Sequence, residues 1–211
     1  MNRVPLSRVF QECKRLEVER RYADALDLLD DCSTIDSGGD PLIWIWKGSL
    51  LLKLGRHREA EQTLRAALVR PEWPNGHPEI ARWLAEVHFR CGRFTDVQQT
   101  TTKWTARGDL ECAALHFRAL LALGRAGEAF PSLMRLAEAA RGHVGLQLVL
   151  LEATLDLRTT QRSEDHSDVS AQCVKRLTNM RSAGVDFNED EHSRFEALLR
   201  RVDGSFGFGR R

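Results

Sequence analysis

The sequence predicts an all-α protein, a right-handed superhelical solenoid of antiparallel helix pairs. About four to five repeats and a C-terminal capping helix are expected. The first observation is a seven-residue sequence motif, here called the phrase, that recurs at intervals of 35, 37 and 32 residues. A period in this range is typical of helical repeat arrays. The second observation is that apolar residues recur at helical spacing on both sides of each phrase.

The recurring phrase marks the turn between two helices of a pair. Its clearest copy is LGRHREA at 54–60, which returns as CGRFTDV at 91–97 and LGRAGEA at 123–129. A degraded first copy, ERRYADA, occupies 19–25. In the clearest copy, Gly55 supplies the left-handed conformation that ends a helix, which glycine adopts at little cost.

The second repeat shows the expected helices in full. An apolar helix is predicted over 42–54, before the turn at Gly55. The helix after the turn carries Ala60, Leu64 and Ala67 on one face, and Pro71 ends it. A single hairpin of this kind cannot bury its apolar face, so the hairpins must stack to form a core.

This pattern resembles the tetratricopeptide repeat (TPR) family, whose repeat is about 34 residues long. The resemblance covers about residues 5–142. It rests on family-type residues at matching places: Tyr22, Ala25, Trp44, Gly48, Ala60, Ala67, Leu84, Ala85, Phe94, Ala129 and Leu136. Two departures are the proline displaced to Pro71, and Trp104 where the family prefers alanine.

The C-terminal third has a weaker pattern. We expect four TPR-like hairpins over 1–142, then a degenerate fifth unit with a capping helix over 143–203, and a flexible Gly-rich tail over 204–211. In the fifth unit a helix over 144–157 precedes an exposed loop over 159–168 and a second helix over 169–182. Asn188 can cap the last helix. Its apolar stripe should cover the open end of the stack and consists of Phe195, Leu198, Leu199 and Val202.

Composition excludes several classes of protein. The net charge of +1 provides no strong field for nucleic acid, and basic residues alternate with acidic ones. No run of about 18 apolar residues predicts a membrane span, and the N-terminal residues do not resemble a signal segment. Five irregularly spaced cysteines predict reduced thiols rather than disulfides. We therefore expect a cytoplasmic protein.

The sequence predicts no catalytic residue, cofactor or metal. The string Asp165-His166-Ser167-Asp168 contains catalytic residue types, but neighbours in sequence rarely form a triad, so a solvated loop is expected. His88 with Cys91, and Cys112 with His116, are spaced like zinc ligands on helices. The repeat register places the two pairs about 16 Å apart, so one metal cannot hold both.

The concave face is the predicted binding surface. The resemblance implies that ligands lie along the first helices of each pair. The candidate residues there are Phe10, Lys14, Ile45, Ser49, Leu52, Arg82, Glu86, Phe89, Arg118, Leu121 and Glu152. Their mixture of apolar side chains and both charges suits a peptide or helical segment of a partner. A clamp for a C-terminal carboxylate is not expected, because Ser49 and Glu86 stand where amides would serve. An alternative is that this face packs against the C-terminal helix.

These observations favour a non-catalytic adaptor or chaperone that binds another protein. One variant resembles the small TPR chaperones of bacterial type III secretion, although no motif separates it from a generic scaffold. The alternative is a structural subunit that docks through its convex face and ends. Exposure of Trp73, in the loop over 71–74, and of the Phe206–Phe208 tail would favour that alternative. An enzyme is the third hypothesis, and the oligomeric state stays open.

Overall fold

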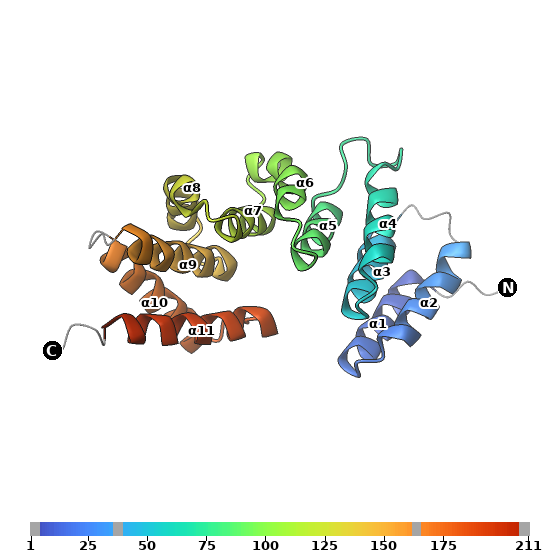
Figure 1. Cartoon of the computed structure of the whole chain (residues 1–211). Helices are drawn as coiled ribbons and strands as arrows, with labels where there is room; N and C mark the ends of the chain where they lie inside the picture. Colours follow the sequence, from blue (N-terminus) through green and yellow to red (C-terminus); the bar gives the residue numbers. More distant parts are fainter. Residues whose placement is uncertain (1–4, 36–39, 162–165, 207–211) are drawn as a thin grey trace. The chain divides into compact units, whose positions relative to one another are not determined.

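The computed structural model describes residues 5–35, 40–161 and 166–206. The regular structure of these residues is helical throughout, as the sequence predicts (Figure 1). The helices follow one another in chain order as α1 (Leu6–Val18), α2 (Tyr22–Ile35), α3 (Pro41–Lys53), α4 (His57–Leu68), α5 (Pro78–Arg90), α6 (Phe94–Ala106), α7 (Leu110–Ala122), α8 (Ala126–Ala139), α9 (Val144–Gln161), α10 (Ser167–Ser182) and α11 (Glu189–Phe206).

The helices gather into two compact units, Met1–Lys103 and Trp104–Arg211, with the boundary inside α6. In the N-terminal unit α1 packs on α2 and α3 on α4. In the C-terminal unit α7 packs on α8 and α9 on α10, and α11 packs on α9. Helix α5 adjoins α6, where the Phe89 ring meets the Phe94 ring edge-on. The described helices therefore form five successive pairs followed by one further helix, which confirms the predicted fold class. The predicted division at residue 142 stays a prediction.

Two helices in the C-terminal unit extend further than the sequence pattern suggested. Helix α9 continues to Gln161, so the start of the expected 159–168 loop is helical. The hydroxyls of Thr159 and Thr160 donate to the carbonyl of Asp156, at 2.8 and 2.9 Å, and so keep these polar residues in the last turn. Helix α11 continues to Phe206, since adding residues to a formed helix costs little. The rest of the expected tail, 207–211, lies outside the described residues.

The turn glycines act as the phrase predicts. Gly55, Gly92 and Gly124 all have left-handed backbones, with φ of +73°, +71° and +73°. After the first of them, the amide of Arg56 donates to the carbonyl of Leu51 at 2.9 Å. The same bond follows the other two glycines. This is the hydrogen-bond pattern of the Schellman motif, which closes a helix and reverses the chain.

The second half of the phrase starts the next helix. The turn arginine pairs with the acidic residue three positions later, and Arg56–Glu59 and Arg125–Glu128 both lie at 2.6 Å. An acidic side chain in the first turn also stabilises the helix dipole. The residue that follows the acid, such as Ala60, is fully buried against the preceding helix. One seven-residue phrase thus specifies a helix end, a turn, a helix start and a packing contact.

The degraded first copy of the phrase places Arg20 in the glycine position. Its φ is +58°, which makes it the one non-glycine residue with positive φ among those described. A left-handed backbone costs a non-glycine residue about 1–2 kcal/mol, whereas glycine adds about 0.5–1 kcal/mol of unfolded-chain entropy. We expect Arg20→Gly to stabilise the N-terminal unit by up to about 1 kcal/mol.

Denaturant unfolding of the Arg20→Gly variant beside the reciprocal Gly55→Arg variant checks this prediction. The first should raise the unfolding midpoint and the second should lower it. A fall in both midpoints would show that contacts of the Arg20 side chain outweigh its backbone strain.

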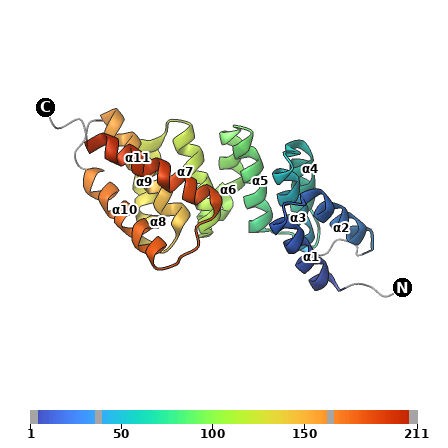
Figure 2. The same ribbon diagram turned by 90° about the horizontal axis from the view of Figure 1, so that it is seen from below.

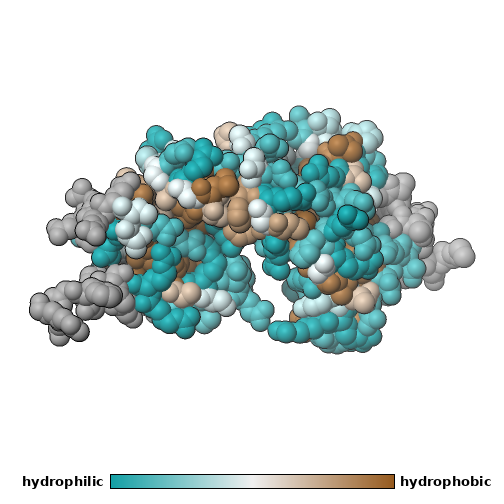
Figure 3. All heavy atoms as spheres, viewed as in Figure 1, coloured by the Kyte–Doolittle hydropathy of each residue, from teal (hydrophilic) through white to brown (hydrophobic). Residues whose placement is uncertain are grey.

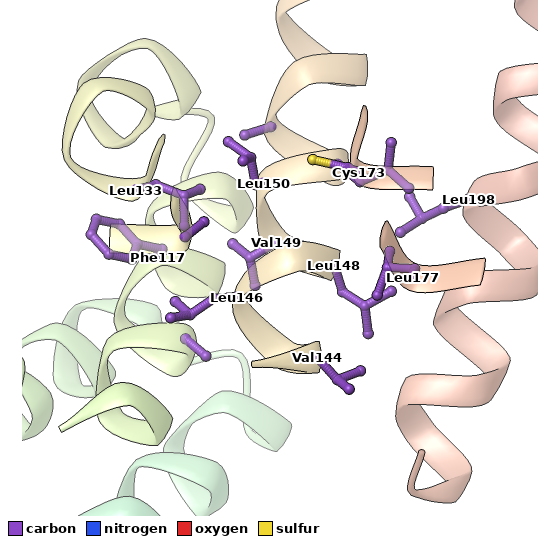
Figure 4. Packing of buried hydrophobic residues seen from close by; sticks show 14 of the residues in the cluster. Phe117, Leu133, Val144, Leu146, Leu148, Val149, Leu150, Cys173, Leu177 and Leu198 are labelled. Carbon is purple, nitrogen blue, oxygen red and sulfur yellow. The ribbon is translucent and has the colours of Figure 1, made fainter. Parts of the chain in front are cut away.

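The core of the C-terminal unit surrounds α9, and Figure 4 shows this packing. Leu146 and Val149 point toward the side of Leu133 on α8, whereas Leu148 points toward Leu177 on α10 and Leu198 on α11. All five leucine and valine side chains from Leu146 to Leu151 are at most 1% exposed. A helix that is apolar on all sides must be enclosed by other helices.

The core of the N-terminal unit lies between successive pairs. Ala60, Leu64 and Ala67 of α4 are fully buried and belong to one cluster with residues of α3 and α5. Gly48 of α3 faces Leu64, and the absence of a side chain there allows the two helices to approach closely. On the side of the molecule seen in Figure 3, hydrophilic residues cover most of each unit.

Candidate functional site

The first helices of the N-terminal unit lie in a row, with α3 between α1 and α5. Helix α3 contacts α1 through the Glu17–Lys53 ion pair and the stacking of Phe10 on Trp46. It packs on α5 along its other side. The candidate residues occupy equivalent repeat positions on these three helices. We call the exposed side of this row the α1–α3–α5 face.

Three candidate residues of α3 lie inside the unit instead of on its surface. Ile45, Ser49 and Leu52 are only 5%, 7% and 3% exposed. Ile45 and Leu52 join the apolar cluster formed with α4 and α5. The Ser49 hydroxyl donates to the carbonyl of Trp46 at 2.9 Å, which satisfies it locally. These three side chains therefore lie in the core beneath the α1–α3–α5 face and do not form its surface.

On α1, two candidate residues are accessible. Phe10 is half-buried, and its ring lies 6.4 Å from the ring of Trp46 at an interplanar angle of 22°. Lys14 follows one turn later and is exposed. Within the part of the chain that the structure describes, Lys14 makes no ion pair. The Phe10–Trp46 aromatic pair and the Lys14 ammonium group, which has no ion-pair partner among the described residues, thus lie beside each other.

On α5, the accessible candidates are Arg82, Glu86 and Phe89. Arg82 pairs with Glu79 of the same helix at 3.2 Å, and its guanidinium lies 5.2 Å from the centre of the Trp83 ring. Glu86 pairs with Arg90 at 3.0 Å, also on α5. The ring of Phe89 meets that of Phe94 edge-on at 5.2 Å. Because these ion pairs within α5 partly neutralise its charges, the α5 part of the α1–α3–α5 face is weakly polar rather than strongly charged.

The candidates of the C-terminal unit are occupied by the chain itself. Arg118 of α7 lies 3.7 Å from Asp190, and Glu152 of α9 lies 2.9 Å from Arg194. Both partners belong to α11, which runs along α9 in Figures 1 and 2. Leu121 is partly buried against the same core. In this unit, the alternative that the face packs against the C-terminal helix is therefore realised.

Helix α11 holds its place with the predicted stripe and with ion pairs that the sequence pattern did not reveal. Phe195, Leu198 and Val202 are buried, as expected of a covering helix. In addition, Arg201 pairs with Asp156 of α9 at 2.7 Å. In the sequence, the only sign of these ion pairs was that charged residues follow the apolar stripe of α11 at helical spacing.

Trp73 belongs to a cluster at the end of α4. The Arg70 guanidinium lies 5.1 Å from the Trp44 ring and 5.9 Å from the Trp73 ring, and it pairs with Glu72 at 2.9 Å. His77 meets the Trp73 ring edge-on. Trp73 is half-buried by these contacts, so it covers the helix ends rather than standing free in a loop.

Of the residues with zinc-like spacing, His88 lies in a polar cluster with Glu61 and Arg93. His88 is 2% exposed, with its Nε2 atom 3.4 Å from Glu61, and burial lowers the pKa of the imidazole. A hydrogen bond from Arg93, at 2.6 Å, lowers the pKa of Glu61 to about 2. Cys91 is exposed at the end of α5. Among the described residues, no three potential metal ligands gather.

Solved structures share this arrangement of helices. A thermophilic TPR protein of Thermus thermophilus superposes with a TM-score of 0.67 and 16% identity, covering 92% of this chain and 98% of its own. The TPR-like repeats of a putative kinesin light chain of Podospora anserina give 0.65 and 15%, covering 84% and 96%. A double mutant of MamA RS-1 gives 0.60 and 14%, covering 86% and 97%.

The chain has the TPR fold. No protein-family model and no curated protein matches its sequence, so the likeness shown is one of fold. TPR arrays are typical scaffolds whose helix faces bind other proteins. None of the described helices of this TPR chain is both long enough and apolar enough to cross a membrane.

Proposed function

We propose that this protein is a non-catalytic adaptor that binds a segment of a partner protein on the α1–α3–α5 face. The observation that carries the proposal is the difference between the two units. In the C-terminal unit α11 engages the equivalent positions, Arg118 and Glu152. In the N-terminal unit Phe10 remains half-buried and Lys14 exposed.

The chemistry of the face favours a particular kind of segment. The Phe10–Trp46 stack presents apolar aromatic surface, which anchors protein contacts well. Lys14 lies one turn away and attracts a carboxylate. The weakly polar surface of α5 completes the row. We therefore expect a peptide or helix with an apolar anchor flanked by an acidic residue.

The binding prediction is tested by reversing charge on the face. We expect Lys14→Glu/Arg82→Glu to reduce recovery of the partner from native lysate at least about tenfold, because both substitutions would repel an acidic segment. A matched control is Arg8→Glu/Arg58→Glu, which reverses two exposed charges on α1 and on the outer helix α4. Helix content by circular dichroism should be equal in both variants.

The control decides how the result is interpreted. A partner retained by the control and lost by the Lys14/Arg82 variant supports the proposal. A partner retained by both moves the contact to the outer helices or the ends, which is the arrangement of a structural subunit. Photo-crosslinking from position 14, compared with position 58, then identifies which face the partner contacts.

A further inference from the structure

A cluster of polar side chains joins the second helix pair, α3 and α4, to the third pair, α5 and α6. Glu61 of α4 accepts hydrogen bonds from Arg93, in the turn between α5 and α6, at 2.6 Å and from Arg65 of its own helix at 2.9 Å. His88 of α5 is 2% exposed, and its Nε2 atom lies 3.4 Å from Oε1 of Glu61. Its Nδ1 atom lies 3.4 Å from the hydroxyl oxygen of Thr100 on α6. The imidazole is therefore enclosed between α4 and both helices of the next pair.

Both ring nitrogens of His88 face oxygen atoms that accept hydrogen bonds. The Thr100 hydroxyl donates its single proton to the carbonyl of Asp96 at 2.8 Å, so toward the ring it can only accept. The Glu61 carboxylate is also an acceptor. A neutral imidazole has one N–H group, so either tautomer leaves one nitrogen lone pair facing an oxygen lone pair. Within the described part of the chain, the buried Nε2 atom forms no hydrogen bond. Only the doubly protonated ring can donate on both sides.

The surroundings of the ring oppose that second proton. Burial lowers the pKa of His88, and the positive charge of Arg93 lowers it further, whereas Glu61 acts in the opposite direction. An imidazolium would also compete with Arg93 for the Glu61 carboxylate, and Asp96, at 3.7 Å from Arg93, is a weaker substitute. A proton on His88 therefore weakens the charged contact between the two helix pairs. The charged and titratable groups of the cluster are Glu61 and Arg65 from α4, Cys91 and Arg93 from the turn, and Asp96 from α6.

We propose that His88, Glu61 and Arg93 form a pH-sensitive latch between the second and third helix pairs, which is closed while the imidazole is neutral and loosens when it takes up a proton. The sign follows from the direction of the shift. Because the folded-state pKa of His88 lies below its ordinary value of 6.5, the open chain binds the proton more readily than the closed one. The stability that the latch contributes is therefore complete above about pH 6.5 and is lost as the pH falls below that value. The inference concerns this junction and does not depend on the α1–α3–α5 face.

Two other groups respond to acid and must be separated from His88. The hydrogen bond from Arg93 lowers the pKa of Glu61 from 4.5 to about 2, so the stability linked to Glu61 is lost only below about pH 4.5. Burial also lowers the pKa of His116, which belongs to the C-terminal unit. Global unfolding would combine the effects of both histidines. The decisive measurement therefore has to be local and to stay above the range in which Glu61 titrates.

Hydrogen exchange of the full chain at pH 7 and pH 5 provides this local measurement. After correction for intrinsic exchange rates, the protection of amides in α4 and α5 should be at least about threefold lower at pH 5, the limit being about tenfold for each pH unit. His88→Gln removes the titrating group and keeps a polar side chain, so its protection should be equal at both pH values. The matched control, His192→Gln, replaces an exposed histidine of α11 and should behave as the wild type.

An NMR titration of the His88 ring distinguishes a latch from a histidine that only fills space. Arg93→Gln should raise the titration midpoint, because it removes a cation and leaves Glu61 to the imidazolium. Glu61→Gln should lower the midpoint, because it removes the carboxylate that favours the proton. Equal protection of the wild type at both pH values would overturn the proposal, as would an equal fall in the His88→Gln variant. Midpoints that move in the same direction, or do not move, would also overturn it. If His88→Gln does not fold, the two midpoint shifts decide the question.

Discussion

Leu146→Ala is expected to lower the free energy of unfolding of the C-terminal unit by about 2–5 kcal/mol. Leu146 is fully buried on α9, at the centre of the cluster that joins α7 and α8 to α10 and α11. Its truncation removes apolar contacts and leaves a cavity that the surrounding helices fill only in part. Denaturant unfolding measures the loss, and hydrogen exchange shows where protection is lost.

The same measurement tests how far the two units unfold separately. Protection should fall in α7 to α11 and stay unchanged in α1 to α5, because each unit has its own internal core. Val185→Ala, at a side chain 42% exposed, serves as the control and should change stability by less than about 0.5 kcal/mol. An equal loss of protection in both units would contradict this prediction and indicate one cooperative folding unit.

Gly48→Val is expected to destabilise the N-terminal unit by about 2–3 kcal/mol through overpacking. A Cβ atom at this position would lie 2.5 Å from Cδ2 and 2.7 Å from Cγ of Leu64. Leu64 is itself fully buried, so it cannot turn away into solvent. The shift in the denaturant midpoint measures the cost. Gly142→Val is the control, because a Cβ at Gly142 would meet nothing within 4 Å.

A double-mutant cycle identifies the cause of that loss. If the clash with Leu64 dominates, Gly48→Val combined with Leu64→Ala should cost less than the two substitutions separately, since the smaller side chain makes room. Additive losses would mean that the helices α3 and α4 move apart instead, and that Leu64 is not the limiting contact.

The turns were predictable from sequence because their physics is local. Gly55 and Arg56 form the Schellman bonds with residues of the same helix, within five positions. The helix pairs could therefore be placed from the phrase alone. Even the degraded copy keeps the turn, with Arg20 in the left-handed conformation that the other copies give to glycine.

The places of the candidate residues in the fold were predictable only in part, and their role in binding stays a prediction. Repeat equivalence correctly placed Phe10, Lys14 and Arg82 on the first helices. It did not show that Ile45 and Leu52 would be enclosed. Burial of α3 depends on how closely α1, α4 and α5 approach it, and that distance is set by contacts between repeats rather than by spacing within one.

The sequence by itself determined that α11 exists, where it begins and which stripe it buries. Its cap at Asn188 and the spacing of Phe195 and Leu198 are properties of one short segment. Only the tertiary structure decided that α11 lies against α7 and α9. Its partner carboxylates, Glu152 and Asp156, are 42 and 45 residues from their arginines, and helical periodicity carries no information over that separation. That packing engages Arg118 and Glu152 with residues of α11.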